Sequence, residues 1–410
     1  MATTRTIKLA TSKLDISKLC EKLSESANQA VAFLESKLQK DGSYGNDAKD
    51  LACYFKSPMM FLAANKPQAA TSILTHIKTA FMTKDGDFTT NETQKSINGA
   101  YAEFWSYTNG WIVRAANQLD ITEISQPGCK YLDQYNLGEK AGFLTNNVRG
   151  QTVVTDVLTV AHHGLINLEI GNLDVAISAG DFLCEAINKQ PNLKNGFNLR
   201  FDKQGNLITE FPKEQTPFYF ISASKPNQLH FMIGYPSAYL AILYKKTKNE
   251  KYLNAAKAYL DFSLSCDKSI YECDFSHKIA WAASFIYECT GDGRYLTVID
   301  KISDYFIAKQ KNGMWFSEDI NSSYDQSAEI ACWFLDIVKN VNGLKKKANL
   351  EEEKLAVPKS NKAWTMQELK YGTMALIAGV GLYTLLKYRT KTTGLCDAVV
   401  NIARGLNGVR

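Results

Sequence analysis

The amino-acid sequence predicts an all-α protein whose helices pair into hairpins and close into an (α/α)6 toroid of about twelve helices. Three observations support this fold class. Apolar residues recur with helical periodicity in successive segments of the first 341 residues. Alternating runs of β-branched residues, which are typical of strands, are almost absent. The connections between the helical segments alternate between short and long.

The predicted helices are separated by turn signals, and each is long enough for several helical turns. They lie at about residues 15–39, 47–64, 66–82, 98–119, 121–135, 153–170, 172–189, 229–247, 249–265, 274–290, 293–310 and 324–341. Tight connections, such as Gly171-Asn172 and Lys248-Asn249, join the second helix to the third, the fourth to the fifth, and so on. The longer connections repeatedly carry a glycine beside an aromatic residue, as in Gly196-Phe197.

This alternation places all short loops at one end of the helix array and all long loops at the other. Six hairpins that close on themselves then form a toroid. An open solenoid of paired helices is the alternative, because the sequence does not show whether the first helix meets the last.

Beyond the predicted toroid, the composition of the chain changes. We expect an N-terminal extension at 1–14, the toroid domain at 15–341, a charged linker at 342–363, a membrane helix at 364–389 and a tail at 390–410. The uncharged stretch 371–386 would cover about 24 Å as a helix, against a hydrocarbon layer of about 30 Å. It predicts a membrane-embedded helix; a helix lying on a membrane surface or a partner, and an ordinary buried helix, are the alternatives.

Charge and cysteine content exclude several classes of protein. The 410 residues carry a net charge of only +5, spread along the chain, so nucleic-acid binding is not expected. Nine scattered cysteines are typical of a reducing compartment, and no cysteine or histidine spacing fits a metal site. The first 18 residues lack the apolar core of a secretory signal. We therefore expect no metal or cofactor and an intracellular location, on the cytosolic face of an organelle membrane.

The long loops should lead into the N-termini of the inner helices, so the first turns of these helices would line one funnel. Four ionisable residues there are candidate catalytic groups. Glu103 and Glu329 lie in apolar runs, where burial would raise the pKa of a carboxyl group and suit it to acid catalysis. His230 and His277 begin two neighbouring inner helices and could exchange protons with a ligand. For both histidines, a purely structural role is the alternative.

Other residues near the funnel are candidate substrate-binding groups, and most of them are aromatic or cationic. Lys56 could bind an anionic head group, although a lysine reaching to the surface is equally compatible with its position. The long connection 195–228 is expected to fold as a hairpin over the mouth and to bring in Arg200. Asp325 is interpreted as a helix cap. The remaining candidates are Tyr54, Tyr101, Trp105, His162, Tyr235, Trp281 and Trp333.

The first hairpin resembles a known repeat. Gln39 to Gly45, with Gly42, Ser43 and Tyr44, is similar to the Gln-to-Gly-x-Trp repeat of the terpenoid cyclase and protein prenyltransferase α/α-toroid superfamily, with Tyr44 in place of tryptophan. Weaker copies lie at 85–88 and 313–315. The resemblance implies the fold, but the acidic and zinc-binding motifs of that superfamily have no counterpart here. A second group with the same toroid contains carbohydrate-active enzymes.

Three functions follow as hypotheses. The first is a membrane-associated, terpenoid cyclase-like enzyme that takes an apolar isoprenoid or polyene substrate from the bilayer through 371–386. It would use metal-independent acid–base cyclisation or isomerisation, with tryptophans that stabilise a cation. The second is a carbohydrate lyase, hydrolase or epimerase. The third is a noncatalytic toroid that serves as a scaffold or as an accessory subunit of a membrane complex.

Overall fold

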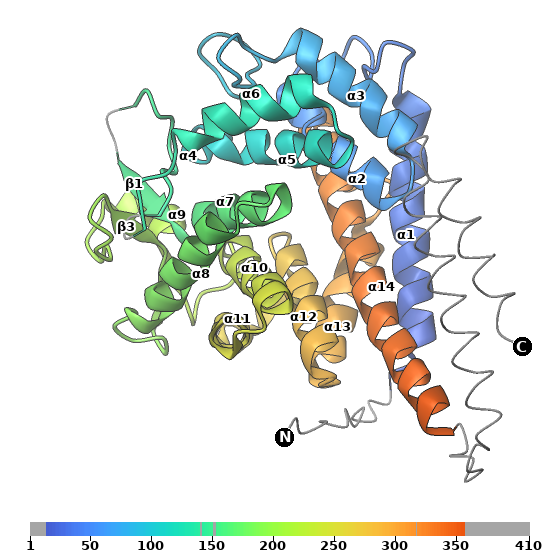
Figure 1. Ribbon diagram of the computed structural model, residues 1–410, viewed down its shortest axis with the longest axis vertical. Coiled ribbons are helices and arrows are strands. Elements are labelled where there is room, and N and C mark those ends of the chain that lie inside the picture. Colours follow the sequence, from blue (N-terminus) through green and yellow to red (C-terminus); the bar gives the residue numbers. More distant parts are fainter. Residues whose placement is uncertain (1–13, 140–141, 151–152, 317, 357–410) are drawn as a thin grey trace, which may run out of the picture. The chain divides into compact units, whose positions relative to one another are not determined.

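The computed structural model describes residues 14–139, 142–150, 153–316 and 318–356. The chain divides into two units, 1–350 and 351–410, and the fold and the sites below lie in the first. Within the described ranges this unit is mostly helical with a few short strands, which confirms the predicted class (Figure 1).

The described helices follow the predicted segments closely. They are α1 (Ile16–Lys37), α2 (Ser57–Ala63), α3 (Pro67–Ala80), α4 (Ala100–Glu103), α5 (Trp105–Gln118), α6 (Thr122–Asp133), α7 (Val157–Ile170), α8 (Leu173–Asn188), α9 (Thr216–Tyr219), α10 (Phe231–Thr247), α11 (Glu250–Ser265), α12 (His277–Thr290), α13 (Arg294–Lys309) and α14 (Ile320–Ala356). Short 3-10 turns lie at Leu51–Cys53, Lys213–Gln215 and Lys268–Glu272. The predicted boundary at residue 341 falls inside α14.

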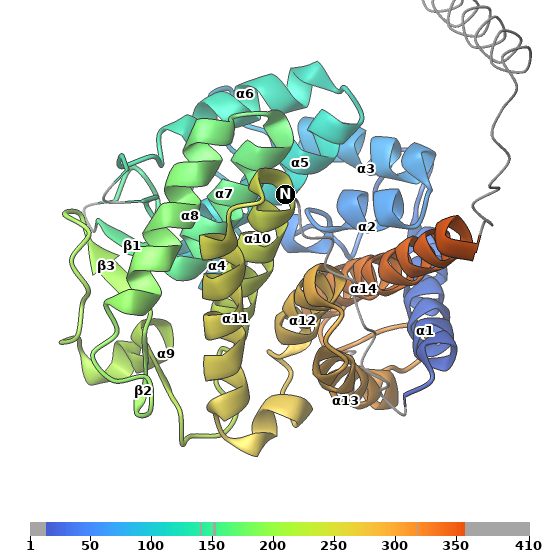
Figure 2. The same ribbon diagram turned by 60° about the horizontal axis from the view of Figure 1, so that its bottom comes forward.

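The helices form an inner and an outer ring. Inner α2, α5, α7, α10 and α12 each pack against the outer helix that follows, which is α3, α6, α8, α11 and α13 in turn. Neighbouring inner helices also pack against one another (Figure 2). The tight loops predicted from the sequence therefore connect an inner helix to its outer partner.

Burial explains which helices are inner. In α7, every residue from Val157 to Ile166 is buried, as expected for a helix surrounded by others. Outer α1 instead buries one stripe, including Leu19, Leu23 and Ala27, and exposes its other face. Asp156 caps the start of α7 by accepting a hydrogen bond from the Thr159 amide at 2.7 Å.

Side-chain contacts close the ring between its first and last helices. In α1, Lys22 pairs with Asp300 of α13 at 2.6 Å. Phe33 of α1 packs edge-on against Tyr324 of α14, with ring centroids 5.7 Å apart. The six-pair toroid is therefore closed, and the open solenoid is excluded.

The long connection after α8 contributes two small sheets. Strand β1 (Val154–Asp156) pairs antiparallel with β3 (Arg200–Asp202), and β2 (Gly196–Asn198) pairs antiparallel with β4 (Phe220–Ser222). The turn expected after β3 is present, because the Asp202 carboxylate accepts hydrogen bonds from the amides of Gln204 and Asn206. Through the pairing of β3 with β1, the connection is thus hydrogen-bonded to the strand that directly precedes α7.

None of the helices that the structure describes combines the length and apolarity needed to cross a bilayer. The segment 371–386, on which the membrane prediction rested, lies outside the described residues.

Candidate active site

A cavity of about 520 Å³ opens at the long-loop end of the toroid. Its lining combines one cluster of charged residues with a largely aromatic wall. The lining residues are Lys56, Asn98, Ala100, Tyr101, Phe104, Tyr107, Leu158, Pro217, Phe218, Leu229, Phe231, Phe275, His277, Lys278, Phe316, Ser322, Asp325, Gln326 and Glu329. This volume lies within the range of about 300–1,000 Å³ that is usual for small-molecule sites.

The charged cluster consists of Lys56, Lys278, Asp325 and Glu329, with His277 beside them. Lys56 Nζ lies 2.8 Å from Asp325 Oδ1 and also contacts Glu329 Oε2. Lys278 Nζ lies 2.7 Å from Glu329 Oε1. All five residues are at most 5% exposed. Asp325 and Glu329 meet the same lysine because they are one helical turn apart in α14.

Neutral donors complete the surroundings of the two carboxylates. Tyr107 donates its hydroxyl to Glu329 Oε1 at 3.0 Å, and Trp333 donates its indole N–H to the same oxygen at 3.3 Å. Tyr101 donates to Asp325 Oδ2 at 2.8 Å. Both oxygens of Glu329 and Oδ2 of Asp325 therefore have protein partners, whereas Asp325 Oδ1 lies beside Lys56 but makes no hydrogen bond with the described residues.

The electrostatics separate the two carboxyl groups. Burial disfavours the charged form of both. For Glu329 the attraction of Lys278 and Lys56 outweighs burial and holds its pKa well below the usual range. For Asp325 burial dominates over Lys56 and raises the pKa. Asp325 is therefore the group of this pair that takes up a proton first.

The nitrogen bases of the cavity are shifted toward their neutral forms. Burial lowers the pKa of Lys278 despite the nearby Glu329, and it lowers the pKa of His277 in the same way. The two lysines differ, because two carboxylates outweigh burial at Lys56 and raise its pKa. Lys278 is thus the lysine that more readily releases a proton.

His277 is the first residue of α12, and one of its ring nitrogens is free. Nδ1 lies 3.4 Å from the carbonyl oxygen of Asp274, which can only accept, so this nitrogen carries the hydrogen. Nε2 lies 3.6 Å from Glu329 Oε1 and makes no hydrogen bond with the described residues. A buried imidazole with an unused lone pair therefore belongs to the cavity.

The wall of the cavity is built from phenylalanines of different elements. Phe104 precedes α5 and contacts Phe218 of α9, with ring centroids 5.9 Å apart. Phe231 of α10 contacts Phe275 in the loop before α12 at 5.8 Å. Phe218 comes from the connection 195–228, so that connection does reach the mouth of the cavity. Phe275 is 39% exposed and lies at the entrance.

Four of the residues singled out from the sequence line this cavity together: Lys56, Tyr101, His277 and Glu329. Behind them lies a second layer of predicted residues. Trp281 and Trp333 pack against each other with their rings tilted by 36° and their centroids 4.0 Å apart. Tyr235 Oη lies 2.8 Å from His162 Nδ1, while His162 Nε2 lies 3.0 Å from the carbonyl oxygen of Tyr107 and must donate to it. These four residues are not part of the cavity lining.

Other predicted residues lie elsewhere. Glu103 pairs with Arg200 at 2.6 Å, and the Arg200 guanidinium lies over the Tyr219 ring. His230 is fully buried beside the start of α10, and neither ring nitrogen has a partner among the described residues. Tyr54 donates its hydroxyl to the carbonyl of Ala48 at 2.6 Å. None of Glu103, Arg200, His230 and Tyr54 lines the cavity.

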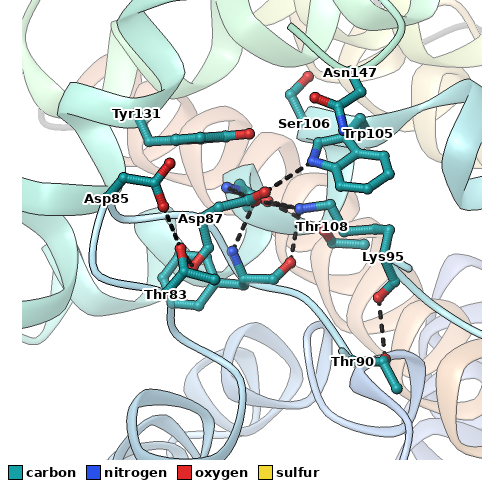
Figure 3. A network of polar contacts seen from close by, with 12 residues as sticks. Thr83, Asp85, Asp87, Thr90, Lys95, Trp105, Ser106, Thr108, Tyr131 and Asn147 are labelled. Carbon is teal, nitrogen blue, oxygen red and sulfur yellow. Dashed lines mark hydrogen bonds and ion pairs between the residues drawn. The ribbon is translucent and has the colours of Figure 1, made fainter. Parts of the chain in front are cut away.

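Trp105 belongs to a separate buried network that holds the loop before α4 (Figure 3). Its indole N–H donates to Asp87 Oδ2 at 2.9 Å. Lys95 contacts Asp87 Oδ1 and donates to the Phe88 carbonyl and to Asn109 Oδ1, both at 2.7 Å. This network ties loop 83–99 to α5, and the cavity residues Tyr101 and Phe104 lie in the short stretch of chain between the two.

Lys278, Asp325 and Tyr107 have a larger part in the site than the sequence suggested. Asp325 is an ion-pair partner rather than a helix cap, because α14 starts five residues earlier, at Ile320. The clue to Lys278 was available, since it follows His277 directly and precedes a long apolar run. Tyr107 carries no comparable signal among the many tyrosines of the chain.

The sequence matches no known protein family and no curated protein. Solved structures do share its fold. A D-mannose isomerase is 12% identical with a TM-score of 0.58, over 78% of this chain and 97% of the other. A family 76 glycoside hydrolase from a bovine Bacteroides thetaiotaomicron strain is 11% identical, with a TM-score of 0.54 over 78% of each chain. An unsaturated glucuronyl hydrolase specific for heparin is 11% identical, with a TM-score of 0.53 over 80% of this chain and 98% of the other.

These findings correct the first hypothesis. The structural neighbours are carbohydrate-active toroid enzymes rather than terpenoid cyclases or prenyltransferases, so the inferred resemblance and the apolar isoprenoid substrate are wrong. The terpenoid cyclase-like activity, which depended on both, is wrong as well. The location on an organelle membrane is also corrected, because it was part of the hypothesis of an apolar substrate taken from the bilayer. At this level of identity, the comparisons establish the α/α-toroid fold of the chain.

Proposed function

We propose that the chain is a carbohydrate-active enzyme, and that it is an isomerase or epimerase that moves a proton at a carbon atom next to a carbonyl group. Three features support a carbohydrate substrate. The fold is shared with structures described as a D-mannose isomerase and as glycoside hydrolases. The cavity is large enough for a monosaccharide, and its aromatic wall surrounds a small group of polar side chains.

One observation favours proton transfer over hydrolysis. Glycoside hydrolysis uses two carboxyl groups that reach the substrate, one as acid and one as base or nucleophile. Here both oxygens of Glu329 and Oδ2 of Asp325 are occupied by lysine, tyrosine and tryptophan donors, and Asp325 Oδ1, which makes no hydrogen bond, is paired with the ammonium group of Lys56. His277 Nε2 also makes no hydrogen bond with the described residues. A free lone pair on His277 therefore favours a nitrogen base.

These bases suit a proton shuttle on an open-chain sugar. His277 Nε2 would take the proton from the carbon next to the carbonyl, while Lys278 donates a proton to the carbonyl oxygen and stabilises the enediol that forms. In an isomerisation the imidazolium returns its proton to the former carbonyl carbon, and the neighbouring hydroxyl group gives its proton back to Lys278 as the new carbonyl forms. In an epimerisation the proton returns to the same carbon from the other face, and the former carbonyl oxygen gives its proton back to Lys278. The ion pair of Lys278 with Glu329 leaves two of its three N–H groups for this purpose.

The remaining charges hold this pair in place. Glu329 stays ionised between the two lysines and lies close enough to stabilise the imidazolium form of His277. Lys56 and Lys278 together balance the two carboxylates, so the buried cluster carries no net charge and can accommodate a neutral sugar. Positioning by Glu329 would therefore matter as much as the proton-transferring groups themselves.

A glycoside hydrolase is the second candidate function, and a specific observation favours it. The pKa of Asp325 is raised while that of Glu329 is lowered, and opposite shifts on neighbouring carboxyl groups are typical of an acid and base pair. This function requires the substrate to displace Tyr101 or Gln326 from Asp325.

The test is hydrogen exchange with solvent. The protein is incubated in D2O with a panel of aldoses and ketoses, and NMR detects deuterium at the carbon next to the carbonyl. We expect exchange for at least one sugar, and its rate should fall by about 10²–10⁴-fold in His277→Asn. Lys66→Gln, on the outside of the toroid, is the matched control and should leave the rate unchanged.

Aryl glycosides are tested in parallel. Release of the aryl group without deuterium incorporation, lost in Asp325→Asn and kept in His277→Asn, would replace the proposal with the hydrolase. Exchange that continues at the wild-type rate in His277→Asn would contradict the assigned base.

A further inference from the structure

A second cavity of about 320 Å³ lies at the short-loop end of the toroid. All six inner helices contribute to it, through residues that lie further along each helix than those lining the first cavity. Examples are Arg114 of α5, Glu169 of α7, Ile242 of α10 and Phe285 of α12. The axis of the toroid is therefore hollow at both ends, and the rings of Trp281 and Trp333, which contact each other, border the second cavity.

Arg114 gives this cavity a fixed hydrogen-bond donor. Its Nε and Nη2 donate to the two carboxylate oxygens of Glu169, both at 2.7 Å. The guanidinium plane lies over the Trp111 ring, with 5.7 Å between Cζ and the ring centroid. Arg114 is 5% exposed, and its Nη1 has no hydrogen-bond partner within the described ranges. An arginine held this firmly presents two N–H groups of fixed direction.

A buried donor without a partner is unfavourable by about 1–3 kcal/mol unless a ligand or a water molecule occupies it. Most buried polar groups in proteins are satisfied for this reason. The other edge of the guanidinium is filled by Glu169, so Nη1 is the part of Arg114 that is left for a ligand, and Arg114 lines this cavity.

The rest of the lining defines the chemistry of that ligand. Apolar side chains form one side, including Met59, Leu165, Leu168 and Ile242. Two acidic groups, Glu169 and Asp336, balance two basic groups, Arg114 and Lys339. The donor without a partner belongs to a cation, Arg114, which favours an anionic acceptor beside Nη1.

We propose that this second cavity is a binding site for a small carboxylate with an apolar tail. The carboxylate would accept hydrogen bonds from Arg114 Nη1, with Lys339 at the rim, and the tail would lie against the leucine and isoleucine side chains. This site is distinct from the charged cluster around Glu329, and it does not depend on the function proposed for that cluster.

Met59 offers a direct test, because it lines the second cavity and no methionine lines the first. The full chain is labelled with ¹³C-methyl methionine, the Met59 resonance is assigned with Met59→Leu, and octanoate is titrated at neutral pH. We expect a saturable shift of this resonance. 1-Octanol, which keeps the tail and lacks the charge, should bind more weakly by about tenfold or more, since it loses a charge-assisted hydrogen bond.

Two filling variants locate the binding. Leu168→Trp places an indole in the second cavity while both residues of the Arg114–Glu169 pair stay unsubstituted, and it should abolish the shift. Leu229→Trp fills the first cavity instead and should leave octanoate affinity unchanged. Absence of a saturable Met59 shift, or equal effects of the two variants, would overturn the site. Equal affinities for octanoate and octanol would overturn the role given to Arg114.

Discussion

Glu329 is the residue on which the buried charge balance depends most, so Glu329→Gln is the most informative single change. Its two oxygens contact Lys56 and Lys278, and both lysines are at most 4% exposed. Glutamine keeps the shape but removes the charge, which leaves two buried ammonium groups to share Asp325. Removing one partner of a buried ion pair usually lowers the free energy of unfolding by about 3–5 kcal/mol.

The second variant separates this cause from a general loss of packing. Lys278→Met removes the ammonium group that Glu329→Gln strands, so the double variant should be more stable than Glu329→Gln alone. Glu35→Gln is the matched control, because Glu35 pairs with Lys66 on the surface, 45% and 39% exposed, and such pairs contribute about 1 kcal/mol or less.

The assay is unfolding in urea at pH 7. The loss is measured as a decrease in the urea concentration at the midpoint of unfolding, with an unchanged slope of the unfolding free energy against urea. A loss of less than about 1 kcal/mol in Glu329→Gln, similar to the surface control, would refute the reasoning, because buried charges of this kind should cost more. The reasoning would also be refuted if the double variant lost as much unfolding free energy as Glu329→Gln and Lys278→Met lose in sum, because the two residues would then not interact.

Three further predictions concern residues outside the cavity. Asp87→Asn leaves the buried Lys95 without its carboxylate partner, so it should lower the free energy of unfolding in urea by about 3–5 kcal/mol. A loss below about 1 kcal/mol would contradict the role given to this ion pair. Burial lowers the pKa of His230 from 6.5 to about 4. As the pH falls from 6.5 to 4, the free energy of unfolding of the wild-type chain should therefore decrease by about 3 kcal/mol more than that of His230→Gln. Curves of unfolding free energy against pH that run parallel for the two proteins would contradict the lowered pKa. Gly110→Ala should lower the melting temperature, since the added Cβ would lie 2.0 Å from His162 Nε2, and an unchanged melting temperature would show that this contact relaxes freely.

The sign of the His230 effect follows from proton binding. Between pH 4 and 6.5 the unfolded chain binds a proton that the folded chain does not, so stability falls as the pH decreases through this window. Below pH 4 both states carry the proton and the loss is complete. The difference between wild type and variant isolates His230 from the other acid-sensitive groups.

Most of the fold could be predicted because it depends on periodic patterns. The apolar period placed the described helices of the toroid, and the alternation of short and long loops separated the inner from the outer ring. Ring closure could not be predicted, since it rests on contacts such as Lys22 with Asp300, whose spacing in the sequence carries no signal.

The site could be predicted only in part. His277, Glu329, Lys56 and Tyr101 lie where inner helices begin, and position alone selected them. Position failed for Glu103, because α4 ends after it and the chain turns before α5, which directs this carboxylate to Arg200. Which charges meet is a property of the closed ring, and it depends on pairs that are hundreds of residues apart.

The contact of Lys56 with Glu329 joins residues separated by 273 positions in the chain. The charged cluster thus assembles from the first and the last inner helix. Until α14 has been synthesised, Lys56 therefore has neither of its acidic partners, Asp325 and Glu329. Contacts of such separation slow folding. Folding of this protein is therefore completed late in synthesis. A product that ends before α14 lacks the contact of Tyr324 with α1 that helps to close the ring, and it lacks both carboxylates of the charged cluster.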